Sequence, residues 1–280
     1  MSKKSMKLHF LIIDPQNDFC SRKGTLFVGD PLNPKPNSAE TDAVRLGACL
    51  KRLKNKIDDI HVTLDEHHPV DIAHPIMWKD SKGNKPNPFT MISYEDVLNG
   101  VWVPFDPSLI PMALNYTKKL KDNGRYVLVI WPPHCLIGTW GACVVDPVFE
   151  SLREWEEGKF AIVDYVTKGS NYTTEHYSAV QADVPDPKDP GSMLQTGPGS
   201  LIHTLQEADL IALSGQALDY CVANTVRDIA NNFGEDNIKK LVLLTDTTSP
   251  VGLDPTLGPN FIAEMAQRGM QLSTSVDFLS

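Results

Sequence analysis

Short, nearly continuous hydrophobic runs alternate along this chain with segments whose apolar positions recur at helical spacing. Such runs, when they are bounded by turn residues, are typical of strands buried on both faces of a sheet. The runs lie at residues 8–13, 60–64, 126–130, 160–166, 210–214 and 241–244. Helical spacing is found at 43–53, 109–120, 148–155 and 261–267.

A further helix is predicted directly after the run at 210–214. Its apolar stripe consists of Val222, Val226, Ile229, Ala230 and Phe233. Asp219 precedes the stripe and is expected to cap the start of the helix. Strands that alternate with helices over the whole length predict a three-layer α/β/α fold with a mostly parallel, six-stranded sheet.

The pattern is interrupted in two places, and we expect both to be insertions in a single domain that spans residues 1–280. Residues 78–107 are polar, contain proline and show no clear period, so we interpret them as an insertion over the active face. Residues 182–200 hold four prolines and three glycines, which indicates a surface loop.

Chemically active side chains follow the predicted strands at their carboxyl ends. In a mostly parallel sheet, ligands bind beyond these ends, so residues that are far apart in the sequence meet at one edge. The side chains that share this position are Asp14, Asp65, His67, His134, Lys168 and Cys221.

Three of these side chains form a candidate nucleophilic group. Cys221 lies near the start of the predicted helix, where unpaired backbone N–H groups favour an anion, so we expect its thiol to ionise easily. Lys168 would lower the thiol pKa further, and Asp14 can accept the proton. Each residue alone also has an ordinary structural explanation: a turn cap, a solvated lysine and a buried cysteine.

A second group suits a metal ion. Asp65 and His67 lie on one turn, and His134 lies on another, so carboxylate and imidazole ligands converge. This donor set favours zinc first, with iron and manganese as the other candidates. His74 is a further candidate ligand that the spacing leaves open, whereas His68 is interpreted as a bystander.

Charge and cysteine content narrow the partners. The formal net charge is -9 and the pI is about 5.3. Nucleic acid and anionic membrane surfaces would repel such a chain, so we expect a small-molecule substrate. Five cysteines without framework spacing favour free thiols in a reducing compartment. The first hydrophobic run is too short for a signal peptide, and we therefore expect a cytoplasmic protein.

Five motifs, in order along nearly the whole chain, resemble the nicotinamidases of the isochorismatase-like cysteine hydrolase superfamily. They are Asp14-Pro15-Gln16-Asn17-Asp18-Phe19; Asp65-Glu66-His67; Trp131-Pro132-Pro133-His134-Cys135 with Gly138-Thr139-Trp140-Gly141; Lys168-Gly169; and Gly215-Gln216-Ala217 ahead of Asp219-Tyr220-Cys221-Val222.

The resemblance implies a catalytic triad of Asp14, Lys168 and Cys221. It also implies that a metal ion held by Asp65, His67 and His134 binds the pyridine nitrogen of the substrate. We expect a metal-assisted amidase that hydrolyses nicotinamide, or a close aromatic carboxamide, to the acid and ammonia through a cysteine thioester.

Other pocket residues follow from the same resemblance. Phe19 and Trp131 match positions that flank the substrate ring, and Tyr177 matches a pocket tyrosine. Gln216-Ala217 matches a non-proline cis peptide that aims the Ala217 N–H, with that of Cys221, at the developing oxyanion. The chain is longer than a compact nicotinamidase, and its loop after His67 is altered.

Three functions therefore remain at this point. Besides the nicotinamidase, the residues permit a cysteine amidase for a ureide or N-carbamoyl compound, in which metal is dispensable, and a ligand-binding relative without turnover. The metal-ligand motifs favour the first over the second, and the complete triad argues against the third. We also expect a homo-oligomer.

Overall fold

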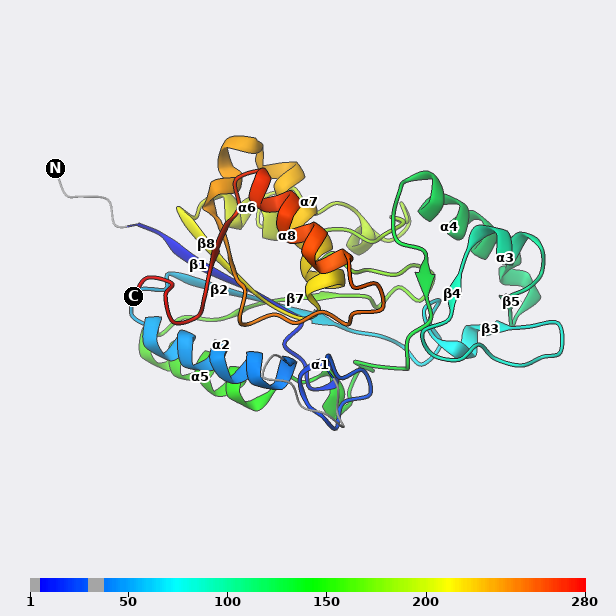
Figure 1. Cartoon of the computed structure of the whole chain (residues 1–280), viewed down its shortest axis with the longest axis horizontal. Coiled ribbons are helices and arrows are strands. Elements are labelled where there is room, and N and C mark those ends of the chain that lie inside the picture. The colour runs from blue at the N-terminus through cyan, green and yellow to red at the C-terminus, as the bar shows by residue number, and fades with distance from the viewer. Residues whose placement is uncertain (1–5, 30–37) are drawn as a thin grey trace.

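Six parallel strands form the central sheet of the computed structural model, which describes residues 6–29 and 38–280 (Figure 1). The strand order across the sheet is β10-β9-β8-β1-β2-β7. The strands are β1 (Leu8–Ile13), β2 (Asp59–Asp65), β7 (Asp164–Lys168), β8 (Leu210–Gly215), β9 (Leu241–Leu244) and β10 (Gln271–Ser273). Every residue of the central strand β1 is buried, as its hydrophobic run predicts.

Helices cover both faces of this sheet (Figure 1). Helices α2 (Ala39–Leu53) and α5 (Asp146–Lys159) pack together on one face. Helices α6 (Leu201–Gln206), α7 (Ala223–Phe233) and α8 (Leu257–Gln267) lie on the other. The short α1 (Asn17–Cys20) follows β1. The three-layer α/β/α prediction is confirmed.

The predicted strand at 126–130 is wrong as a member of this sheet. Its core forms β6 (Leu128–Val129), which pairs antiparallel with β4 (Met91–Ile92) outside the central sheet. The sixth place belongs to β10, which the hydrophobic pattern missed. Because β10 is a three-residue edge strand whose side chains are not fully buried, it carries no hydrophobic run.

The predicted strand at 160–166 is shifted toward its carboxyl end. Phe160 ends α5 in the left-handed conformation, with a φ of 52°, and its side chain is fully exposed. The strand begins at Asp164 and ends at Lys168. Because β7 is an edge strand with mostly exposed residues, hydrophobicity does not mark its bounds.

Residues 78–107 belong to a small lobe beyond the carboxyl ends of the central strands (Figure 1). The lobe contains β3 (Trp78–Lys79) paired with β5 (Val103–Pro104), the β4–β6 pair, α3 (Tyr94–Leu98) and α4 (Ile110–Asp122). In residues 182–200 the only regular element is a short 3-10 turn, η4 (Pro190–Ser192). The loop prediction for that segment is confirmed.

The turn after β8 brings the chain very close to β1. Gly215 has a φ of 119°, and a Cβ atom there would lie 1.9 Å from the Ile13 carbonyl oxygen, so only glycine fits. The next peptide bond, Gln216-Ala217, is cis, as the resemblance implies. A π-helical turn, η5 (Leu218–Val222), follows and leads into α7, whose predicted apolar stripe is buried.

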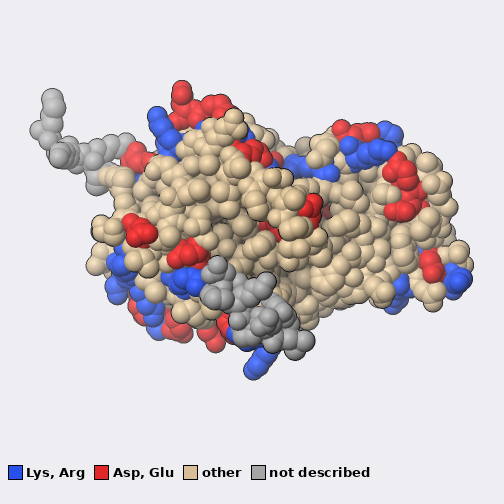
Figure 2. Space-filling view, viewed as in Figure 1, with Lys and Arg blue, Asp and Glu red and all other residues tan. Residues whose placement is uncertain are grey.

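The molecular surface carries charges of both signs, and the cysteines are thiols that form no disulfide bonds. On the face shown in Figure 2, Lys and Arg side chains lie interspersed with Asp and Glu. All five cysteines are free, and only Cys143 is exposed. Within the residues described, no helix combines the length and the apolar character needed to cross a bilayer.

Candidate active site

Lys168 lies at the centre of the candidate site and contacts three predicted site residues. Its Nζ is 2.9 Å from Asp14 Oδ2, 2.9 Å from Asp65 Oδ1 and 3.6 Å from Cys221 Sγ. All four residues are buried. The predicted meeting of an amine, an acid and a thiol at one edge of the sheet is confirmed as geometry.

The strand ends explain how these side chains are positioned. Asp14 follows β1 with a φ of 46°, and its backbone N–H donates to the Thr63 carbonyl at 3.1 Å. The Thr63 hydroxyl in turn donates to Asp14 Oδ1. Lys168 is the last residue of β7 and lies in register with Asp65, the last residue of β2. Adjacent parallel strands therefore place the amine between the two carboxylates.

Burial controls the charges in this group. It would lower the pKa of Lys168, but Asp14 and Asp65 outweigh it and hold that pKa well above its ordinary value, so the ammonium is charged. Burial also raises the pKa of Asp14, against the attraction of Lys168. The ammonium is thus the fixed charge around which the other groups titrate.

The expectation of an easily ionised thiol is wrong for the site as it stands. Burial raises the pKa of Cys221 well above its ordinary value. Lys168 lowers that pKa, but the carboxylates of Asp14 and Asp65 raise it. The candidate nucleophile is therefore a thiol beside a carboxylate, not a preformed thiolate.

The predicted metal ligands also converge. Asp65 Oδ2 is 3.0 Å from His67 Nε2 and 3.4 Å from His134 Nε2. The second ring nitrogen of each histidine has a hydrogen-bond partner of its own. His67 Nδ1 is 3.1 Å from Asp71 Oδ2, and His134 Nδ1 is 2.9 Å from the Pro132 carbonyl oxygen. Histidines that bind metal are usually oriented in this way, so the donor set fits a divalent ion.

His74 adds an observation that favours metal binding. Its ring centroid lies 5.3 Å from that of His67 and 5.7 Å from that of His134. Nδ1 is 3.3 Å from the Pro69 carbonyl oxygen, whereas the buried Nε2 has no hydrogen-bond partner among the described residues. Burial, and next His134, lower the pKa of His74 to about 4, so its imidazole is neutral and can act as a ligand.

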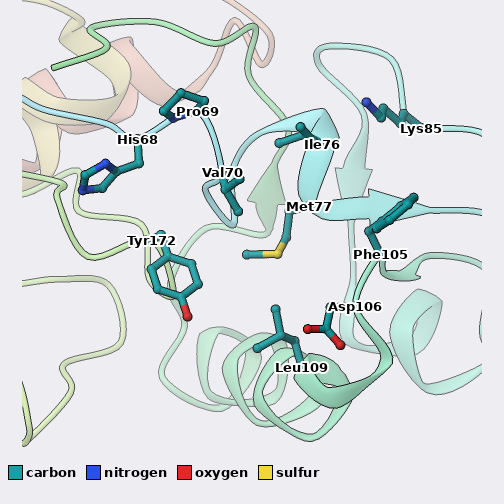
Figure 3. Close-up of a pocket in the computed structure, with 10 residues that line it drawn as sticks. All are labelled: His68, Pro69, Val70, Ile76, Met77, Lys85, Phe105, Asp106, Leu109 and Tyr172. Atoms are coloured by element: carbon teal, nitrogen blue, oxygen red, sulfur yellow. The ribbon is translucent and has the colours of Figure 1, made fainter. Parts of the chain in front are cut away.

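His68 lies apart from this cluster. It is exposed and lines a separate cavity of about 830 Å³ between the loop after His67 and the small lobe (Figure 3). In Figure 3 the side chains of Val70, Ile76 and Met77 give that cavity an apolar wall. His68 is therefore outside the candidate metal site, as expected of a bystander.

The pocket at Cys221 has aromatic walls and little free space. Phe19 packs edge-on against His134, with ring centroids 5.3 Å apart, and the Trp131 indole N–H donates to the Tyr177 hydroxyl at 3.0 Å. Ala217 also lines the pocket. The free volume is about 20 Å³, which is room for roughly one water molecule. An aromatic ring enters only if the walls move apart.

Sequence reasoning missed four residues that line this pocket, which are Leu26, Glu175, Tyr220 and Val251. Tyr220 packs at a right angle to Trp131, with ring centroids 5.0 Å apart. Glu175 is buried in the same wall, and its Oε2 has no hydrogen-bond partner among the described residues. Tyr220 could have been found from its place beside Cys221. No periodicity marks Glu175, which lies in the loop after β7.

Polar residues of the first motif hold the neighbouring loops. Gln16 receives the Asp65 backbone N–H at 2.8 Å and donates to the Asp65 carbonyl at 2.7 Å. Asp18 receives the Cys135 N–H at 2.7 Å. A Cβ at Gly141 would lie 2.0 Å from Asp18 Oδ2, which explains the glycine there. These residues support the candidate ligands without being ligands themselves.

The prediction that Asp219 caps the start of the helix is wrong. Asp219 lies inside η5, and its carboxylate receives the backbone N–H groups of Val251 and Gly252, each at 2.9 Å. The carboxylate therefore ties the turn that carries Cys221 to the loop after β9. The chain enters α7 through the π-helical turn η5, which is wider than an α-helical turn. The prediction assumed α-helical spacing from the first turn.

The chain resembles known proteins in sequence. No family model matches the chain. A nicotinamidase from Saccharomyces cerevisiae is 25% identical over 251 residues, which cover 88% of this chain and 89% of that protein.

Solved structures show the same fold. The structure of the yeast nicotinamidase bound to the inhibitor nicotinaldehyde matches with a TM-score of 0.62 and 20% identity, over 95% of this chain and 99% of that one. A pyrazinamidase of Pyrococcus horikoshii in complex with zinc matches with a TM-score of 0.54 and 18% identity, over 96% and 99%. In sequence and in fold, the chain is similar to known nicotinamidases.

Proposed function

We propose that the chain is a metal-assisted amidase that hydrolyses nicotinamide, or a close aromatic carboxamide, to the acid and ammonia. The observation that carries the proposal is the position of Lys168, which contacts the thiol of Cys221, the base Asp14 and the ligand carboxylate of Asp65 at once. A binding protein has no physical need for such a buried, charge-balanced nucleophile.

In the proposed reaction, Asp14 takes the proton of Cys221 as the sulfur attacks the amide carbonyl. The backbone N–H groups of Ala217 and Cys221 hold the charge that develops on the oxygen. Asp14 then passes the proton to the leaving nitrogen, and ammonia departs from a thioester on Cys221. Water, with Asp14 again as base, releases the acid and restores the thiol. Lys168 stays charged throughout and stabilises the carboxylate of Asp14 and the negative charge that develops on the sulfur of Cys221.

A divalent ion would be held by Asp65, His67 and His134, with His74 as a fourth ligand. The unpartnered Nε2 of buried His74 and the outer hydrogen bonds of His67 and His134 fit this assignment. When bound, the ion supplies a Lewis acid for a ring nitrogen of the substrate. The solved relative that contains zinc makes zinc the first candidate.

The walls of the pocket favour a flat aromatic substrate. We assign Phe19 and Trp131 to the two sides of the ring, with Tyr177 held beside them by the indole N–H. Relatives whose names record nicotinamide and pyrazinamide hydrolysis support this substrate class. The assignment makes the ring nitrogen, not only the amide, a recognised group.

Ammonia release from a matched panel tests the proposal. We expect turnover of nicotinamide and pyrazinamide, and slow turnover of benzamide, because benzamide keeps the amide but lacks the ring nitrogen. An N-carbamoyl amine represents the ureide class. Hydrolysis of the ureide alone, or of no compound in the panel by the zinc-loaded protein, would contradict the proposed function.

A further inference from the structure

A second group of side chains that could hold a metal ion lies at the opposite, amino-terminal ends of the central strands. His9 is near the start of β1, and Asp59 and His61 are near the start of β2. One ligand atom from each of the three lies within 4.8 Å of the others. A strand rises about 3.3 Å per residue, so His61 and Asp65 are separated by roughly 13 Å along β2. The two groups are therefore distinct.

The two imidazoles already have the separation that one ion requires. His9 Nδ1 and His61 Nε2 are 3.1 Å apart. Two nitrogens bonded to zinc at about 2.0–2.1 Å in tetrahedral geometry lie about 3.3 Å apart, so only a small movement is needed. Asp59 Oδ2 is 4.0 Å from His61 Nε2, and its side chain is 36% exposed, which leaves it room to turn inward.

A carboxylate on the next strand fixes the orientation of His61. Its Nδ1 is 2.8 Å from Oδ2 of Asp164, which is its register partner on β7. With the proton on Nδ1, the lone pair of Nε2 is directed toward His9, as in carboxylate–histidine–metal arrangements.

We propose that His9, Asp59 and His61 bind a divalent cation of the zinc class, with water in the fourth position. The ion would tie β1 to β2 at the amino edge of the sheet, with access to solvent past Asp59. The simpler alternative is a hydrogen bond between the two imidazoles without an ion. This inference does not depend on the proposed amidase activity, since the two sites share no residue.

Zinc stoichiometry of the full chain distinguishes the two possibilities. The protein is stripped with a chelator, reloaded with zinc, dialysed against metal-free buffer and analysed by mass spectrometry for zinc per chain. We expect two ions for the wild type and one for His9→Gln, with ammonia release from nicotinamide within about twofold of the wild type. His134→Ala should also bind one ion but should release no ammonia.

Two further variants keep the test decisive. Asp59→Asn alters a half-exposed side chain, so it replaces His9→Gln if that variant does not fold, and it should also bind one ion. His203→Gln changes an exposed histidine on α6 and should keep two ions. Equal zinc content per chain in the wild type, His9→Gln and Asp59→Asn would overturn the second site. Absent ammonia release with two ions bound would contradict only the proposed function.

Discussion

Lys168 and Asp65 form a buried ion pair, 2.9 Å between Nζ and Oδ1, that joins the candidate nucleophile to the candidate metal ligands. The same amine faces Asp14 at 2.9 Å. One ammonium therefore balances two carboxylates that belong to different parts of the proposed chemistry. Loss of that charge affects both parts and the fold itself.

We predict that Lys168→Met lowers the free energy of unfolding by about 3–5 kcal/mol, because it leaves two buried carboxylates without a counter-charge. Urea denaturation of the metal-free protein measures the change. Lys118→Met removes an exposed ion pair on α4 and serves as the control, with no measurable loss expected. Equal stability of the two variants would show that the buried pair contributes nothing to folding.

Cys221→Ala should abolish ammonia release and leave the metal in place. The sulfur is the proposed nucleophile, and loss of a nucleophile lowers turnover by at least about 10⁴-fold. Zinc content should be unchanged, since Cys221 is not among the candidate ligands. Cys143→Ala removes the exposed thiol and should behave as the wild type. Ordinary turnover by Cys221→Ala would end the proposed mechanism.

His74 and His68 provide a matched pair for the fourth metal ligand. His74→Ala removes the unpartnered Nε2 beside the cluster, and we expect zinc affinity to fall at least about tenfold, which is what loss of even an outer partner commonly costs. His68→Ala changes a residue of the outer cavity and should leave the affinity unchanged. Competition with a chromophoric chelator measures both. Equal affinities would remove His74 from the ligand set.

Glu175 should make the apo protein less stable as the pH rises. Burial raises its pKa from 4.5 to about 8, so between these values the unfolded chain has lost a proton that the folded chain still holds. Stability attributable to this group therefore falls with increasing pH, by about 1.4 kcal/mol per pH unit. Glu175→Gln removes that dependence.

Urea denaturation of the metal-free protein at several pH values between 5 and 8 measures this effect, as the difference between the wild type and Glu175→Gln. The difference should grow steadily toward pH 8. Glu157→Gln, on the exposed side of α5, should show no such trend. A constant difference would mean that Glu175 is already ionised in the folded protein.

Side chains at strand ends could be predicted from the sequence because the parallel-sheet rule collects them at one edge. Asp14 and Cys221 are far apart in the chain, yet each follows a strand that the hydrophobic pattern located. Lys168 ends β7, which the pattern located only approximately. Edge strands are the limit of this approach. β10 is three residues long and incompletely buried, so only pairing with β9 identifies it.

The charge states of buried groups could not be predicted from the sequence either. The position of Cys221 near a helix start suggested a lowered pKa, but burial outweighs the nearby ammonium. Glu175 reaches the pocket through the path of its loop after β7, which no residue spacing encodes. Local pattern places backbone elements, whereas the charge state of a buried group depends on every neighbour around it.

The middle position of β1 has a consequence for biosynthesis. Of the six strands in the sheet, β1 leaves the ribosome before the others, but one of its two partners, β8, begins only at Leu210. Such distant pairings delay folding, because a long loop must close before the contacts form. A nascent chain that ends after β7 would hold Asp14 and Lys168 without their sulfur, so the proposed chemistry is assembled only late in translation.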